Sequence, residues 1–417
     1  MGILFLLFFV ISPIILLYTA GYRYDTQNHI ILQTGVISID VRPNTAVVYI
    51  GDNAVVGSLP LRITNVAPGS YPVRIEATGY RTFYADLTVK SSETAFIRNL
   101  TLVREYEPVP FFIPINNANA TFFSPNGRYL LEQQTDQLIT TNIETAEQRI
   151  FQTKGDLHLS PFDESFVDII SVSSSWRIEL QKLNATHNSN NVLIPKSNQV
   201  LSWHWNKGAR SPSIYANVGN TIWRIENGRR EEIGTVTNDN GLWYVDDRSV
   251  LWQLANTNIL EQVKNPDLHL QIEPGVQSII DISDERILLQ YPDVIRVYDR
   301  RTNHMQSISG KREHMRYSQE RQLWILTAGN ELWEISDRGD VRLLERVGDT
   351  ITSAYAIPNT TYIAYSTPKS VVLLDTFFGL RYILIKEGIS PIVHGASNNP
   401  KRILYEQENM YFTIAIE

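Results

Sequence analysis

Residues 120–133, ATFFSPNGRYLLEQ, contain the repeating unit that decides the fold of this chain. An apolar run at residues 120–123 precedes a polar turn at residues 124–127, and a second apolar run follows the turn. Two further strand-like stretches complete the unit before it starts again. Comparable turns begin at Ser124, Ser160, Trp205, Asp246, Ser283, Ser318, Ile357 and Ser397, 35 to 45 residues apart with a mean of 39. Four short strands in each period predict an all-β fold with an eight-bladed β-propeller at residues 120–417, or alternatively a seven-bladed one.

The composition describes an ordered chain without cysteine. Its 417 residues favour two or three domains, and its 43% hydrophobic and 19% charged residues are typical of globular proteins. With 37 basic and 44 acidic residues the net charge is −7, so we expect no nucleic-acid partner. The lack of cysteine excludes disulfides and thiolate metal sites.

The N-terminal segment is strongly apolar. Only Ser12 and Pro13 break the apolar run at residues 3–18. Residues 2–20 contain 19 uncharged residues, just enough to cross a bilayer as a helix. The aromatic and basic residues next to this run are Tyr18, Tyr22, Arg23 and Tyr24. Such residues are typical of a lipid–water interface. Residues 1–24 are therefore predicted to be a single-pass transmembrane anchor with an interfacial flank.

Two alternatives to an anchor remain, a cleaved signal peptide and a buried core helix. A signal peptide needs a basic start and small residues before the cut, but no Lys or Arg precedes this run and Tyr18 would occupy the −3 position. Orientation is open, because Arg23 lies on the wrong flank for an exported C-terminus under the positive-inside rule. Either a basic N-terminal tail is missing, or the long following domain translocates regardless of charge. We expect the bulk of the chain to be extracytoplasmic.

Residues 35–104 are predicted to form a small β-sandwich. Apolar residues alternate with polar ones, as in Ile37, Ile39 and Val41 around Ser38 and Asp40. Period-two alternation indicates strands with one buried face.

Four motifs in this region resemble a PEGA domain. They are the run Pro43–Gly51 ending in Val-Tyr-Ile-Gly, the step Gly57–Pro60, the turn Val66–Tyr71 and the pair Gly79-Tyr80. Asn44 and Thr45 replace the middle letters of the Pro-Glu-Gly-Ala motif that names the family. The resemblance implies a small non-enzymatic module of bacterial envelope and surface proteins, often next to a membrane anchor or a repeat domain.

The linker at residues 105–119 contains Pro108, Pro110 and Pro114, which favour a stiff, extended segment. Its apolar part, residues 111–115, is alternatively a strand. The eighth repeat has room for only about three strands before the C-terminus. We therefore expect residues 111–115 to complete the last blade.

The predicted inner strands carry little catalytic chemistry. They are residues 120–123, 157–159, 200–204, 241–245, 279–282, 315–317, 353–356 and 391–394. Their only carboxylate is Asp281, whereas glycosidic hydrolysis usually requires two. Asp281 is interpreted as a hydrogen-bonded or turn-facing residue. The chain has no Gly-x-Ser-x-Gly elbow and no phosphate-binding glycine motif, so neither catalysis nor a cofactor is expected.

Metal sites are not expected either. His158, His204 and His394 fall on predicted inner strands and would have to meet in the channel, without supporting ligands at set spacing. The fragment at residues 238–241, Asn-Asp-Asn-Gly, lacks the rest of a calcium loop and is interpreted as a tight turn.

Two surface features are candidates for binding. The basic residues Arg296, Arg300, Arg301, Lys311, Arg312, Arg316 and Arg321 outnumber the acidic residues among them. They predict an anionic-ligand patch, or alternatively a solvated blade edge. The tryptophans of the repeats are expected to pack between blades, with a sugar platform as the alternative.

These observations predict a non-catalytic envelope scaffold or recognition protein. Its N-terminal helix contacts membrane lipid and anchors the chain, and its ligand is an envelope protein or polysaccharide. One alternative is a polysaccharide hydrolase or lyase, which two or more carboxylates at one propeller mouth would favour. An apolar or aromatic channel would favour binding. A third class is an assembly factor that docks proteins on blade edges by strand addition.

Overall fold

The computed structural model describes most of the chain. The described residues are 2–19, 21–25, 30–112, 119–125, 127–185, 190–196, 201–209, 211–237, 241–256, 258–386, 390–398, 401–408 and 410–416. They divide into two compact units, Met1–Pro108 with Ile414–Glu417, and Val109–Thr413. Apart from one α-helix and the 3₁₀ turn η1 (Arg312–His314), their regular structure consists of β-strands, so the predicted all-β class is confirmed.

The first unit begins with α1 (Gly2–Thr19) and a hairpin of β1 (Tyr22–Asp25) and β2 (Ile30–Gln33). Large apolar side chains of α1 are exposed, among them Phe8, Phe9 and Leu16. Within the described residues, no helix meets both the length and the hydropathy required to cross a membrane.

Two small sheets form the rest of the first unit. One has the order β6 (Leu61–Val66), β3 (Gly35–Arg42), β9 (Thr94–Thr101). The other has the order β5 (Asn53–Ala54), β4 (Val47–Ile50), β7 (Gly69–Glu76), β8 (Phe83–Val89). Ile37, Ile39 and Val41 of β3 are fully buried while Ser38 and Asp40 are not, so the alternation in the sequence produces the buried face.

The second unit contains eight four-stranded antiparallel sheets in its described residues, named sheets 1 to 8 in chain order, with the sheet that holds the last three strands of the chain as sheet 8. Sheets 1 and 2 are β11 (Ala120–Phe123), β12 (Tyr129–Gln133), β13 (Gln137–Asn142), β14 (Gln148–Gln152), and β15 (Asp156–Leu159), β16 (Ser165–Val172), β17 (Ser175–Lys182), β18 (Asn190–Pro195). Sheets 3 and 4 are β19 (Ser202–Trp205), β20 (Ser213–Val218), β21 (Thr221–Glu226), β22 (Arg229–Thr235), and β23 (Trp243–Val245), β24 (Leu251–Asn256), β25 (Ile259–Gln262), β26 (Asn265–Gln271). Each of these sheets keeps its strands in chain order.

The next three sheets repeat this order. Sheet 5 is β27 (Ser278–Ile282), β28 (Arg286–Gln290), β29 (Val294–Asp299), β30 (His304–Ser309). Sheet 6 is β31 (Met315–Ser318), β32 (Leu323–Ala328), β33 (Glu331–Ser336), β34 (Val341–Arg346). Sheet 7 is β35 (Ser353–Ala356), β36 (Tyr362–Thr367), β37 (Ser370–Asp375), β38 (Leu380–Lys386).

Sheet 8 combines strands from both ends of the second unit. It contains β39 (Ile392–Asn398), β40 (Lys401–Gln407) and β41 (Met410–Ala415), with β10 (Val109–Phe112) as its fourth strand. β10 pairs antiparallel with β41, so that Val109 lies opposite Thr413. The prediction that this segment supplies the missing strand is confirmed for residues 111–112, and the strand begins two residues earlier than expected. Residues 113–115 of the predicted strand lie outside the described residues.

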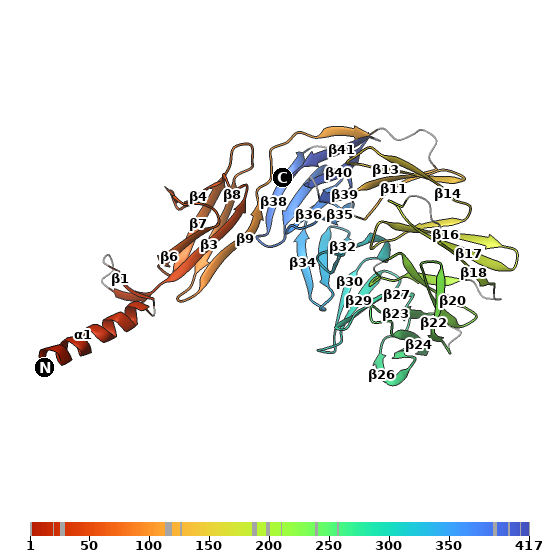
Figure 1. Cartoon of the computed structure of the whole chain (residues 1–417), viewed down its shortest axis with the longest axis horizontal. Helices are drawn as coiled ribbons and strands as arrows, with labels where there is room; N and C mark the ends of the chain where they lie inside the picture. Colours follow the sequence, from red (N-terminus) through yellow and green to blue (C-terminus); the bar gives the residue numbers. More distant parts are fainter. Residues whose placement is uncertain are drawn as a thin grey trace. The chain divides into compact units, whose positions relative to one another are not determined.

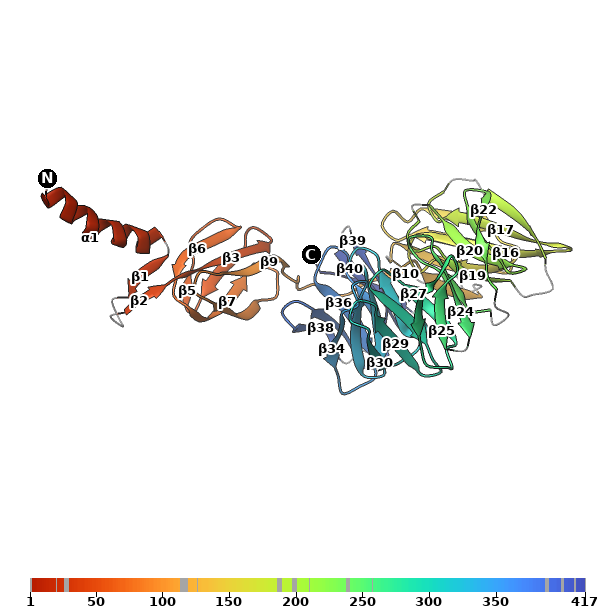
Figure 2. The ribbon, with the colours of Figure 1, turned by 90° about the horizontal axis from the view of Figure 1, so that it is seen from below.

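The eight sheets pack in cyclic order (Figure 1), and Figure 2 shows the same sheets turned by 90°. A separate apolar cluster joins sheets 1 and 2, 2 and 3, 3 and 4, 4 and 5, 5 and 6, and 6 and 7. Sheets 7 and 8 meet where the Val393 N–H donates to Ser366 Oγ, at 3.2 Å. Leu130 of sheet 1 packs against Leu404 of sheet 8, which brings the last sheet back to the first.

Two glycines allow sheets 1 and 8 to approach closely. A Cβ on Gly395 would lie 2.6 Å from the Cα of Gly127, and a Cβ on Gly127 would lie 2.7 Å from the nitrogen of Ala396. Gly127 also has a positive φ of 65°. Backbone atoms cannot move aside as a flexible side chain does, so both positions require glycine.

We predict that Gly395→Ala lowers the free energy of unfolding by about 1–3 kcal/mol, because the added methyl group forces sheets 1 and 8 apart. Gly348→Ala is the matched control, since no atom lies within 4 Å of its added Cβ. Denaturant unfolding of both variants measures the difference. Equal stability of the two variants would contradict the close contact.

Candidate functional site

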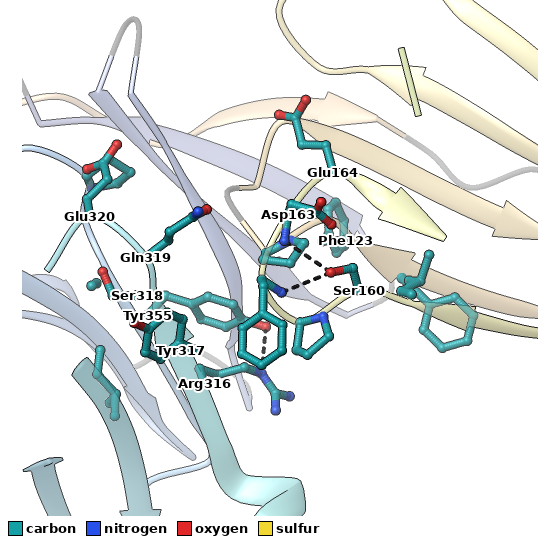
Figure 3. A pocket seen from close by; sticks show the side chains of 18 of the residues that line it. Phe123, Ser160, Asp163, Glu164, Arg316, Tyr317, Ser318, Gln319, Glu320 and Tyr355 are labelled. Atoms are coloured by element: carbon teal, nitrogen blue, oxygen red, sulfur yellow. Dashed lines mark hydrogen bonds between the residues drawn. The ribbon is translucent and has the colours of Figure 1, made fainter. Parts of the chain in front are cut away.

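A cavity of about 970 Å³ opens at the centre of the second unit. It is lined by residues of β11, β31, β35 and β39 and by turns that follow first strands, including the turn after β15 (Figure 3). The lining therefore comes from sheets on opposite sides of the cyclic arrangement. The repeating turns that revealed the fold in the sequence also shape this site.

Aromatic side chains form much of the cavity wall. Phe162, from the turn after β15, lies edge-on to Tyr317 with ring centroids 5.5 Å apart, and its ring is 6.0 Å from that of Trp324. These contacts join sheet 2 to sheet 6. Phe123 and Tyr355 line other parts of the cavity.

Three carboxylates line the same cavity. Asp163 and Glu164 are neighbours on one turn, and Glu320 comes from the turn after β31. Asp163 Oδ1 accepts a hydrogen bond from the Ser165 hydroxyl. Glu320 Oε2 accepts the N–H of Asn359 at 2.9 Å. At least two of the three therefore hold turns in place.

Three basic residues line the cavity, Lys182, Arg316 and His394. Arg316 donates from Nη1 to the carbonyl oxygens of Glu313 and Met315, both at 2.9 Å, and its guanidinium lies 5.9 Å from the Tyr355 ring. His394 Nε2 is 2.8 Å from Glu406 Oε2. Burial lowers the pKa of His394, and the Glu406 carboxylate acts in the opposite direction.

A buried ionic network lies next to the cavity, where Tyr317 and the Lys207–Gly208 turn meet. Lys207 Nζ is 2.8 Å from Asp281 Oδ2 and 2.9 Å from both carboxylate oxygens of Asp337. Arg286, which is fully buried, donates to Asp281 Oδ2 at 2.9 Å and also contacts Asp337. Two cations and two anions from sheets 3, 5 and 6 thus neutralise one another in the interior.

Neutral donors complete this network. Trp324 Nε1 donates to Asp281 at 2.8 Å, the Tyr244 hydroxyl donates to Asp281 at 3.1 Å, and the Tyr317 hydroxyl donates to Asp337 at 2.8 Å. Burial strongly opposes the ionisation of Asp281, but Arg286 and Lys207 outweigh it and hold the pKa of Asp281 well below its usual range. Asp281 is therefore the hydrogen-bonded residue predicted from the sequence, with a structural role.

The three inner-strand histidines lie in separate surroundings. His158 packs against Trp203 with ring centroids 5.0 Å apart. His204 stacks on Tyr244 at 4.4 Å and accepts the N–H of Val245 at Nε2, and burial lowers its pKa to about 4. Among the described residues, no group of three or more His, Asp or Glu side chains could hold a metal ion. Residues 238–240 lie outside the described part of the chain.

The seven basic residues of the predicted anionic patch occupy different environments. Arg296 contacts Glu273, Arg300 donates to the Ser283 carbonyl oxygen, and Arg321 donates to Thr376. Lys311 lies 3.7 Å from Asp293, and Arg316 lines the cavity. The exposed residues Arg301 and Arg312 complete the set. An anionic ligand at these residues stays a prediction.

The predicted membrane-interface residues gather at the end of α1. Arg23 Nη1 donates to the carbonyl oxygens of Tyr18 and Tyr22 at 2.7 and 2.8 Å, and its guanidinium lies 3.8 Å from the Tyr18 ring. Tyr18 and Tyr24 are largely exposed. Arg23 therefore stabilises the helix C-terminus, where a cation is favourable.

Sequence reasoning missed Phe162, Lys207 and Asp337 as parts of the central site. Phe162 and Lys207 lie within the repeating turns at Ser160 and Trp205, so the turn pattern contained a signal for them. Asp337 follows β33 and had no such signal. Of the repeat tryptophans, Trp205, Trp243, Trp252 and Trp324 are buried, as expected for packing between sheets.

Comparisons with known proteins identify one module. The PEGA domain family matches residues 34–105, which confirms the PEGA domain predicted at residues 35–104. No curated protein matches the chain.

Several solved structures are similar to this chain at low identity. The uncharacterized protein lmo1340 from Listeria monocytogenes EGD-e is 10% identical, with a TM-score of 0.42, over 67% of this chain and 98% of that one. U3-55K is 10% identical with a TM-score of 0.41, over 74% and 98% of the two chains. A eukaryotic initiation factor is 12% identical with a TM-score of 0.39, over 75% and 94%.

We predict that Lys207→Met lowers the free energy of unfolding by about 3–5 kcal/mol, because it leaves the fully buried Asp281 and the partly buried Asp337 against one cation. Adding Asp337→Asn to this variant should restore part of the loss. The control is Lys264→Met at an exposed position, which should change stability by less than about 0.5 kcal/mol. Thermal or denaturant unfolding compares them. A Lys207 variant as stable as the control would show that the network contributes nothing.

Proposed function

We propose that this chain is a non-catalytic, membrane-anchored cell-envelope protein that presents a recognition site at the centre of an eight-bladed β-propeller. The observation that carries this proposal is the cavity lined by residues of sheets 1, 2, 3, 6, 7 and 8. Neighbouring groups hold Asp163, Glu320 and Arg316 in place. The cavity wall also includes the aromatic side chains of Phe122, Phe123, Phe162, Tyr317 and Tyr355.

The propeller assignment is supported by the repetition of four-stranded sheets and by their cyclic packing. Each sheet contributes one blade, and β10 supplies the outer strand of the last blade. The ring of blades closes without a covalent bond, because β10 from the start of the unit pairs with β41 from its end. Propellers have many functions, so the site must decide between them.

Recognition fits the cavity better than hydrolysis. The three lining carboxylates are the feature that would favour a polysaccharide hydrolase. However, Asp163 and Glu320 are engaged in fixing turns, and Asp281 is neutralised by Lys207 and Arg286. The PEGA domain is not a catalytic family, which agrees with a binding role for the whole chain.

Membrane anchoring at the cell envelope is the second part of the proposal. PEGA domains are usually extracellular or periplasmic. The α1 helix, which precedes this domain, exposes Phe8, Phe9 and Leu16, and aromatic residues follow it. An apolar helix with an aromatic flank is suited to burial in lipid. In this arrangement the helix anchors the chain and the propeller faces away from the cytoplasm.

The chain lacks cysteine, so single-cysteine variants test both parts of the proposal. Gln319 lines the cavity and is exposed, whereas Ala364 is fully buried. We predict that a membrane-impermeant maleimide added to intact cells labels Gln319→Cys and leaves Ala364→Cys unlabelled. After an alkaline wash the full-length chain should stay with the membranes, and a variant without residues 2–19 should not.

Two results would contradict the proposal. Labelling of Gln319→Cys only after lysis would place the cavity on the cytoplasmic side. Release of the full-length chain by the alkaline wash would exclude α1 as an anchor.

A further inference from the structure

We propose that the central cavity binds a neutral oligosaccharide segment of a polysaccharide. This inference rests on the proposed recognition function and names its ligand class. A sugar ring presents apolar C–H faces and an edge of paired hydroxyl groups. A complementary site needs exposed aromatic faces and planar polar groups that do not already have partners.

The aromatic part of this requirement is met by several rings. Phe122 on β11 is 40% exposed, and Tyr355 on β35 is partly exposed in the same cavity. Phe162 and Tyr317 hold each other edge-to-face, which fixes the orientation of both rings. Fixed aromatic rings supply contact area at low cost in conformational entropy.

The polar part is met by side chains at the rim. Lys182, Asn184 and Gln319 line the cavity, are exposed, and have no side-chain hydrogen-bond partner among the described residues. Arg316 uses Nη1 and Nε for contacts within the protein, and Nη2 has no partner within the described ranges. An amide both donates and accepts, and a guanidinium donates in pairs, so these groups match adjacent hydroxyls.

The charge balance favours a neutral ligand. The lining contains Lys182 and Arg316 against Asp163, Glu164 and Glu320, so neither sign dominates. A polyanion would meet the three carboxylates, and a polycation would meet the two basic groups. The volume of about 970 Å³ lies at the upper end of the range for small-ligand pockets, which suits several linked sugar units.

The test uses the purified full-length chain in detergent and three defined probes. These are the hexasaccharides of β-1,4-linked N-acetylglucosamine, β-1,4-linked glucose and α-1,4-linked glucose. Binding is followed by calorimetry and by tryptophan fluorescence, since Trp324 contacts two cavity rings. We expect at least one probe to bind saturably.

Matched variants locate the binding. Arg316→Ala should weaken it by about tenfold or more, and Gln319→Ala by about two- to tenfold, from the loss of hydrogen bonds to the ligand. Arg301→Ala removes an exposed arginine that does not line the cavity and should leave affinity within about twofold. Thermal melts of all three variants show whether the fold is retained.

The proposal is overturned if none of the hexasaccharides binds, or if Arg316→Ala and Gln319→Ala bind as tightly as the Arg301→Ala control. Labelling of Gln319→Cys in intact cells would still support an exposed recognition site. Failure of the oligosaccharide proposal is therefore distinguishable from failure of the proposed recognition function. Saturable binding of a capped peptide in place of the sugars would also overturn the ligand class. Shortening of a hexasaccharide would support the ligand class and contradict the non-catalytic function.

Discussion

The antiparallel pairing of β10 with β41 is the constraint on which the second unit depends. Each sheet buries its apolar faces against its neighbours, so a linear series would leave the two end sheets uncovered. Because β10 comes from the start of the unit and pairs with its last strand, the backbone hydrogen bonds of sheet 8 hold the two ends together. Gly127 and Gly395 then allow sheets 1 and 8 to pack at backbone distance.

The interior of this arrangement is filled unevenly. Lys207, Asp281, Arg286 and Asp337 occupy one part with a neutral, hydrogen-bonded network, and Phe162 reaches across to sheet 6. The open cavity is the space that these groups leave. Tyr317 belongs to both regions, since its hydroxyl donates to Asp337 and its ring lines the cavity. The network therefore positions a wall of the proposed binding site.

The local pattern of apolar and turn residues was enough to predict the strands. It was not enough to predict the ionic network and the cavity at the centre of the second unit. The predicted inner strands at residues 120–123 and 353–356 coincide with β11 and β35, because alternation and turn residues act over a few positions. Lys207 and Asp337 are separated by 130 residues and meet only after the sheets assemble. No periodicity encodes such a contact. Arg286 on β28 also gave no signal, since a buried arginine looks like a surface one in sequence.

Native-state hydrogen exchange of β41 in the full-length chain tests the central claim most directly. If β10 pairs with it, β41 is an interior strand, and its amides should be protected as strongly as those of β40. The outer strand β14 of sheet 1 provides the reference for an edge. Exchange in β41 as fast as in β14 would contradict the pairing, and with it the joining of sheet 8 to the start of the second unit.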